Sequence, residues 1–201
     1  MADRSGSDPV VQARRRAVVD RPWTWLTQVH GADVVVVAGP GDGAGEPADA
    51  AVSVRSDVAL AIVTADCAPV AFASPEGVVG VAHAGWRGLV AGVLEATVTA
   101  MRGAGARTIV AALGPCIHAE CYPFGPSDLD MVAERLGAEV RGRSAAGQPA
   151  LDIPRAVRLV LRRVDVDVVV DAAVCTACSV DHWSWRARQE RGRQASVVWL
   201  P

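Results

Sequence analysis

Long runs of valine and other apolar residues constrain the fold of this chain more than any other feature of its 201 residues. The runs are nearly continuous rather than alternating, which is typical of strands that are covered on both faces. They occupy residues 23–29, 34–38, 50–54, 58–65, 70–73 and 78–83, and later 108–113, 166–170 and 196–200. The pattern therefore predicts a buried, strand-rich core.

Helical periodicity appears after the sixth run. Apolar residues from Leu89 to Met101 recur on one side of a predicted helix that stops at Gly103. Two further helices are predicted over 127–136 and 153–164, the second with Asp152 as its cap and Pro154 near its start. Together with the strands, they predict a mixed α/β fold, a mixed β-sheet sandwich covered by helices.

The chain is predicted to form a single domain over residues 23–201, preceded by a polar, Arg-rich segment over residues 1–22. Hydrophobic residues make up 51% of the chain and charged residues 21%, which is enough apolar material for a substantial core. The Gly- and Pro-containing stretches 39–47 and 141–149 are predicted to be surface loops of that domain.

Composition excludes several classes of function. All 20 cationic residues are Arg, so Schiff-base chemistry and a Walker-type phosphate loop, which both need lysine, cannot operate. A net charge of -2 provides no electrostatic argument for nucleic-acid binding. The N-terminus lacks the apolar core of a secretory signal, and no apolar run reaches membrane-spanning length. We expect a cytoplasmic protein without nucleic-acid or membrane partners, whose five cysteines act as thiols, ligands or a nucleophile.

Three residues with reactive side chains lie at the ends of predicted strands. His30 follows the first strand, Cys67 follows the fourth and His83 ends the sixth. Because α/β folds assemble sites at strand ends, we expect these side chains to meet. Two imidazoles and a thiolate suit Zn(II) with an open fourth position, but the same residues could form a cysteine nucleophile with a histidine base.

Charged neighbours extend this candidate site. Arg87 follows Gly85 at the start of the predicted helix, where a guanidinium and free N–H groups could bind phosphate or carboxylate. Asp66 could orient a histidine or polarise a water molecule, or it could cap the following turn. Cys175 and Cys178 form a lone C-x-x-C, which without a second pair does not define a zinc or redox site.

Several motifs in series resemble the YfiH family, also called the laccase-domain, polyphenol oxidase or purine nucleoside phosphorylase family. The matching segments are TQVHGADVVVV (27–37), ADAAVS (48–53), LAIVTADCAPV (60–70), GVAHAGWRGLVAGVLEATV (80–98), ALGPCIHAECYPFG (112–125), CTAC (175–178), SWR (184–186) and GRQASVVWL (192–200). They extend over nearly all of the chain from Trp23 onward. One segment departs from the family, because typical members open with F-x-x-R-x-G-G-x-S and a Leu-Asn-Leu stretch, whereas this chain opens with MADRSGSD. The resemblance thus implies an N-terminal segment that is shortened relative to the family.

The resemblance implies a fold and a set of site residues. The fold is an α/β sandwich similar to the YfiH-like putative cysteine hydrolase fold. His30, Cys67 and His83 are expected to be the metal-binding and catalytic residues, with zinc as the metal and copper as a second candidate. Beside what the resemblance implies, Asp66 is expected to take part in catalysis because it is the nearest carboxylate in the sequence. Arg87 and Gln28 are expected to bind substrate or phosphate.

The resemblance also implies activities, of which several stay open. Relatives are associated with phosphorolysis of adenosine, inosine and methylthioadenosine, with adenosine deamination, and in older descriptions with copper-dependent oxidation of phenols. Four histidines, at 30, 83, 118 and 182, are too few for a conventional multicopper laccase. We expect phosphorolysis first, with a purine nucleoside and phosphate as partners, because Arg87 suits an anion. A polyphenol oxidase and a non-enzymatic metal-binding accessory protein are the alternatives.

Overall fold

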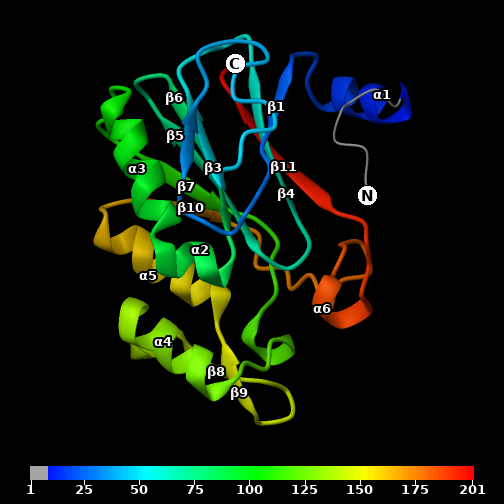
Figure 1. Ribbon diagram of the computed structural model, residues 1–201, viewed down its shortest axis with the longest axis vertical. Helices are drawn as coiled ribbons and strands as arrows, with labels where there is room; N and C mark the ends of the chain where they lie inside the picture. The colour runs from blue at the N-terminus through cyan, green and yellow to red at the C-terminus, as the bar shows by residue number, and fades with distance from the viewer. Residues whose placement is uncertain (1–8) are drawn as a thin grey trace.

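The computed structural model describes residues 9–201, and its named strands form three sheets (Figure 1). The six-stranded sheet has the order β10 (Asp167–Asp171), β7 (Val110–Leu113), β5 (Ala68–Ser74), β6 (Val78–Ala84), β3 (Ala50–Ser53) and β2 (Val34–Val36). The three-stranded sheet has the order β1 (Trp23–Trp25), β4 (Ala59–Thr64) and β11 (Gln194–Trp199), and a small ribbon pairs β8 (Arg141–Arg143) with β9 (Pro149–Leu151).

Both larger sheets are mixed, as the sequence predicts. In the six-stranded sheet, β6 runs antiparallel to β5 and β3, while β2 is parallel to β3 and β10 is parallel to β7. In the three-stranded sheet, β1 is parallel to β4 and β11 is antiparallel to it. The two sheets pack face to face, with β4 against β6 and an apolar layer that includes Leu60, Ile62, Val79 and Val81. This packing makes the predicted sandwich.

Helices cover the other face of the six-stranded sheet (Figure 1). They are α2 (Trp86–Ala91), α3 (Val93–Gly103) and α5 (Ile153–Arg163), and α4 (Pro126–Leu136) packs against α2 and α5 rather than on the sheet. All seven residues of β6 are buried, because one face of this strand contacts α3 and the other contacts β4. The continuous Val-rich runs predicted strands that are covered on both faces, and this prediction is confirmed for β6.

The predicted helix over 89–101 is two helices. Gly92 has a φ of 94°, in the left-handed region, so it ends α2 and begins α3. A residue with a side chain would be strained there, and glycine is not. The helical spacing of apolar residues continues across this break because Leu89, Val93 and Leu94, from both helices, pack into the same core.

The remaining elements frame the ends of the sandwich. A short helix, α1 (Pro9–Val18), precedes β1 within the polar, Arg-rich segment. The predicted polar segment over residues 1–22 lies partly outside the described residues. Its boundary with the domain at residue 22 stays a prediction. The sequence did not predict α6 (Trp185–Arg188) or the β8–β9 ribbon, which are short. No helix within residues 9–201 is long and apolar enough to cross a membrane.

Candidate active site

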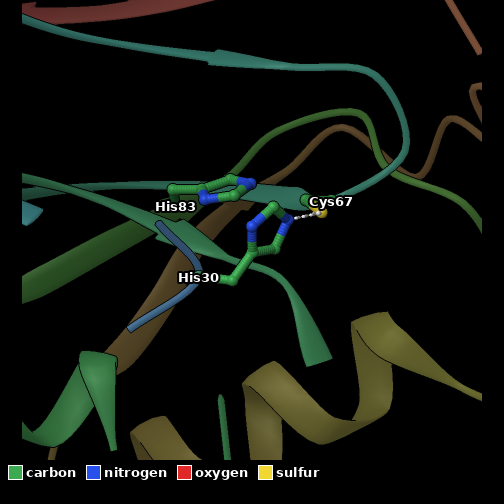
Figure 2. A group of neighbouring side chains, drawn as sticks. All are labelled: His30, Cys67 and His83. Atoms are coloured by element: carbon green, nitrogen blue, oxygen red, sulfur yellow. Dashed lines mark hydrogen bonds between the residues drawn. The ribbon is translucent and has the colours of Figure 1, made fainter. Parts of the chain in front are cut away.

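His30, Cys67 and His83 lie together, with one potential ligand atom of each within 4.8 Å of the others (Figure 2). The Cys67 Sγ is 3.9 Å from the His30 Nε2, and the two imidazole rings meet edge to face with centroids 4.7 Å apart. The structure therefore brings together the three residues that the sequence singled out.

Strand pairing explains how two of them meet. Cys67 directly precedes β5, whose Ala68 pairs with Ala84 of the antiparallel β6. The beginning of β5 thus lies beside the end of β6, where His83 is located. His30 reaches them from the segment between β1 and β2. The expectation that strand ends converge holds for Cys67 and His83, which lie at adjoining ends of neighbouring strands of the six-stranded sheet, while His30 comes from the segment that connects the two packed sheets.

A buried carboxylate that the sequence analysis missed holds both histidines. The Asp49 Oδ1 lies 2.8 Å from the His83 Nδ1, so a proton on that nitrogen is donated to the carboxylate and the Nε2 stays available. The backbone N–H groups of Val29, His30 and Gly31 also donate to Asp49, at 2.7–3.1 Å. The available signal was an acidic residue directly before the apolar strand 50–53.

This carboxylate also supports a strained backbone. His30 has a φ of 62°, in the left-handed region that residues with a side chain seldom adopt. Such a conformation costs on the order of 1–3 kcal/mol and persists where neighbouring interactions impose it. The three N–H bonds to Asp49 supply that constraint, so the fold directs the His30 ring at Cys67.

Electrostatic coupling changes the protonation of the cluster. Burial alone would raise the pKa of Cys67, but its contacts with His30 and His83 outweigh burial and lower the pKa to about 6. Burial would lower the pKa of His83, yet Asp49 and the Cys67 thiolate raise it to about 9. Burial would likewise raise the pKa of Asp49, whose hydrogen bonds from His83 and the backbone hold it below the usual value. The cluster therefore favours a thiolate at neutral pH.

The donor set fits a borderline-soft divalent cation. Two imidazole nitrogens and one thiolate sulfur are ligands that zinc and copper both accept. The backbone of Gly85 also fits closely around the cluster, because a Cβ there would lie 2.9 Å from the His30 Cδ2 and 3.0 Å from the Cys67 Sγ. A side chain at position 85 would displace two of the three candidate ligands.

The trio opens into a cavity of about 470 Å³. Aromatic and cationic side chains line it: Trp86, Arg87, Tyr122, Trp185, Arg186 and Arg193. Thr64 also lines it, and its buried Oγ1 has no hydrogen-bond partner within residues 9–201. A larger cavity, of about 700 Å³, lies beside α1 and β1 and includes none of the trio. The smaller cavity combines reactive side chains with room for a ligand, so it is the candidate site.

Asp66 joins the C-terminal part of the chain to this cavity. Its Oδ1 accepts hydrogen bonds from the Thr176 and Ser184 hydroxyls, each at 2.7 Å, and its Oδ2 accepts one from the Arg186 backbone N–H at 2.7 Å. Its φ of 98° is again in the left-handed region. These bonds fix the segment that brings Arg186 to the cavity, and they occupy both carboxylate oxygens. A catalytic role for Asp66 stays a prediction.

The two predicted substrate-binding residues also line the cavity. The Arg87 guanidinium lies over the Trp86 ring, 4.3 Å from its centroid. Gln28 pairs its amide with both backbone groups of Val63, at 2.8 and 2.9 Å, and so joins the His30 segment to β4. Arg87 thus presents a charge to a ligand, whereas the amide of Gln28 already has backbone partners. Substrate binding by either residue stays a prediction.

Comparisons with known proteins agree with this geometry. A family model described as multi-copper polyphenol oxidoreductase laccase matches residues 7–201. The chain belongs to this laccase-domain, or YfiH, family. A purine nucleoside phosphorylase of Streptomyces coelicolor is 42% identical over 180 residues, which cover 88% of this chain and 74% of that protein. The purine nucleoside phosphorylase YfiH of Escherichia coli is 38% identical over 183 residues, covering 88% and 73%.

Solved structures show the same fold for the YfiH family. A Neisseria meningitidis protein superposes with a TM-score of 0.83 at 33% identity, covering 98% of this chain and 84% of that one. A Bacillus licheniformis YfiH protein superposes with a TM-score of 0.85 at 23% identity, covering 96% and 80%. The α/β class predicted from the sequence is therefore confirmed.

The other two histidines lie apart from the trio. His118 neighbours Glu120 and Cys175, and the His182 Nδ1 is 2.8 Å from the Ser179 Oγ. Neither residue lines the candidate cavity. Because a trinuclear copper cluster needs several converging imidazoles, the described residues of this YfiH-family chain do not provide the ligands of a multicopper oxidase.

Proposed function

We propose that this chain is a purine nucleoside phosphorylase that uses a zinc ion bound by His30, Cys67 and His83. The observation that carries the proposal is the cavity in which this donor set faces arginine and aromatic side chains. Its relatives in Streptomyces coelicolor and Escherichia coli are named as purine nucleoside phosphorylases. Zinc suits two imidazoles and one thiolate, and copper is the alternative metal for the same ligands.

Arginine supplies the binding site for phosphate in this proposal. Arg87 and Arg186 line the same cavity, and their planar guanidinium groups can each donate two parallel hydrogen bonds to phosphate oxygens. The chain has no lysine that could perform this task. Trp86 and Tyr122 hold the two guanidinium groups, which lie over their rings at 4.3 and 4.9 Å from the ring centroids. The phosphate would thus meet charges whose positions are already set.

The nucleoside occupies the rest of the cavity. A volume of about 470 Å³ is within the range of small-molecule sites. The aromatic faces around the cavity can stack on a purine, and the buried Thr64 hydroxyl offers a hydrogen bond to a polar substrate atom. An unpartnered buried hydroxyl costs free energy, so a substrate atom that pairs with it would gain affinity.

The reaction requires two polar molecules to be held in line. A phosphate oxygen attacks C1′ of the ribose, the C1′–N9 bond breaks, and its electron pair leaves with the purine, which takes up a proton. A zinc ion held by the trio would supply Lewis-acid stabilisation of developing negative charge. Arg87 and Arg186 orient the phosphate, while Asp49 keeps the His83 ring in place through the Nδ1. Asp66 holds Arg186 at the wall of the cavity.

The test is turnover with and without phosphate. Zinc-loaded protein is incubated with adenosine or inosine, and free base, ribose 1-phosphate and inosine are followed by chromatography. We expect base release that requires phosphate. Phosphate-independent loss of the amino group from adenosine would instead show a deaminase. Oxidation of phenols by the copper-loaded form would show an oxidase, and no turnover with full metal occupancy would favour a metal-binding accessory protein.

A variant locates the phosphate site. Arg87→Ala should raise the KM for phosphate by about 10- to 100-fold, because it removes hydrogen bonds to a charged group. Arg162→Ala is the matched control, since Arg162 is exposed on α5 and does not line the cavity. An unchanged phosphate KM in Arg87→Ala would contradict this role.

A further inference from the structure

A second group of possible metal ligands consists of three cysteines outside the candidate cavity. Cys121 ends a 3-10 helix over Ala119–Cys121, and Cys175 and Cys178 lie in the turn that follows β10. Their Sγ atoms all lie within 4.8 Å of one another, and the Cys121 and Cys178 sulfurs are 3.2 Å apart. The fold thus brings together the lone C-x-x-C of the sequence and a third cysteine 57 residues before Cys178.

The spacing of these sulfurs resembles that of a zinc–thiolate site. Zinc binds thiolates at about 2.3 Å in a tetrahedron, which places neighbouring sulfurs about 3.8 Å apart. Small shifts of exposed or half-buried side chains would bring the three sulfurs to that spacing, since Cys178 is exposed and Cys121 is half-buried. The solvent exposure of Cys178 also leaves a path by which a cation can enter.

The backbone around Cys175 is arranged as it is around a thiolate ligand. The Cys175 Sγ accepts a hydrogen bond from the backbone N–H of His118 at 3.4 Å. The backbone N–H of Ser179 donates to the Cys175 carbonyl at 3.0 Å, which closes the C-x-x-C into a turn. Such N–H donors stabilise negative charge on a ligating sulfur and hold it in place.

A fourth donor lies next to the cysteines. A ring nitrogen of His118, a sulfur of Cys175 and a carboxylate oxygen of Glu120 also lie within 4.8 Å of one another. His118 is half-buried and its Nδ1 lies 3.6 Å from the Glu120 Oε1, so binding at the three sulfurs would require its ring to turn away from Glu120. Three thiolates and one imidazole make the Cys₃His set of closed, structural zinc sites.

We propose that Cys121, Cys175 and Cys178, with His118 as the fourth ligand, bind a second thiophilic divalent cation of the zinc type. This site is separate from the His30–Cys67–His83 trio and does not depend on the proposed function of that trio. The ion would join the Ala119–Cys121 helix to the turn after β10. It would therefore stabilise the turn from which Thr176 donates its hydroxyl to Asp66 at the wall of the candidate active site.

Cobalt titration of the reduced, metal-free protein tests the proposal, because each Co(II)–thiolate bond adds charge-transfer absorption. The wild-type chain should bind about two equivalents of Co(II), one at each cluster. Cys178→Ser should lose about one equivalent and most of the charge-transfer absorption. Cys67→Ser, the matched control at the trio, should also lose about one equivalent but keep most of that absorption. Equal Co(II) binding by wild type and Cys178→Ser would overturn the proposal.

Protection from alkylation provides a readout that needs no variant. Iodoacetamide should label Cys121 and Cys178 slowly in the zinc-loaded wild-type protein and at least about 10-fold faster after a chelator removes the metal. Equal labelling rates with and without zinc would overturn the proposal. The proposal would also be overturned if the wild-type protein kept under air bound no metal at the three cysteines and its mass were lower by two hydrogens. That result would identify Cys121 and Cys178 as a disulfide.

Discussion

The two cysteine clusters of this molecule place the same functional group in opposite electrostatic surroundings. Cys67 faces two imidazoles that a buried carboxylate orients, and its pKa falls to about 6 despite burial. Cys121 faces two other thiols, and burial together with those thiols raises its pKa to about 12. Neighbouring charges therefore decide whether a thiol is ionised before a metal arrives. The first cluster is prepared as a thiolate, whereas the second ionises when a cation binds.

Alkylation rates should show the largest difference between the clusters. In the metal-free protein, the pKa of Cys67 is lowered from 9.0 to about 6, so its thiolate forms as the pH rises through about 6. The thiolate of Cys121 forms only near pH 12. At pH 7 we expect Cys67 to react about 100-fold faster with iodoacetamide, after allowing for the lower nucleophilicity of a less basic thiolate.

Peptide mass spectrometry across a pH series measures both rates in one sample. The Cys67 rate should level off above about pH 7, while the Cys121 rate should still increase at pH 10. Cys116 is buried and serves as an internal control that should stay unlabelled. Equal rates for Cys67 and Cys121 at pH 7 would contradict the proposed difference in their surroundings.

Asp49→Asn should weaken metal binding at the first cluster alone. The asparagine keeps the size of the side chain but loses the charge that orients and polarises the His83 ring. Changes of this kind lower metal affinity by about 10- to 100-fold. Competition with a chelator measures the affinity of each cluster, and the exposed acid in Asp128→Asn on α4 provides a control. A loss of affinity at the cysteine cluster in Asp49→Asn would show that the clusters are not independent.

Thr176→Val should have the smallest effect, since it tests the contact that joins the two regions. The substitution keeps the shape of the side chain and removes the hydrogen bond to the Asp66 Oδ1, which leaves that oxygen with the Ser184 hydroxyl. The free energy of unfolding should fall by about 1–3 kcal/mol, measured with urea. Thr99→Val, on the exposed side of α3, is the control. A change as small as that of an ordinary surface substitution, about 0.5 kcal/mol, would show that Thr176 does not hold the two regions together.

Most of the strands and the members of the trio could be predicted from local sequence. The Val-rich runs are long and continuous, and that pattern directly reflects burial on both faces. His30, Cys67 and His83 each lie near the end of such a run, which is where functional residues gather in α/β folds. The break at Gly92 could not be predicted from periodicity, because the helices on its two sides pack into the same core.

The partners of the site residues could not be predicted in the same way. Asp49 contacts His83 across 34 residues, and Asp66 contacts Ser184 across 118. Asp49 precedes an apolar strand and Asp66 precedes Cys67, but neither local sequence shows which distant residues the acid contacts. The sequence suggested that Asp66 could orient a histidine, polarise a water molecule or cap the following turn, and nothing in it indicated that Asp66 accepts hydrogen bonds from the C-terminal segment.

The sequence by itself determined which chemical groups this protein has. It supplies arginine in place of lysine for any anion, and two imidazoles and a thiol at strand ends. Only the tertiary structure decided which of those groups meet and in which protonation state. The fold places Cys67 beside two imidazoles that lower its pKa despite burial, and folding of the C-terminal segment brings Cys175 and Cys178 to Cys121. The physical reason is that pKa and metal binding depend on charges a few ångströms away in space, whatever their separation along the chain.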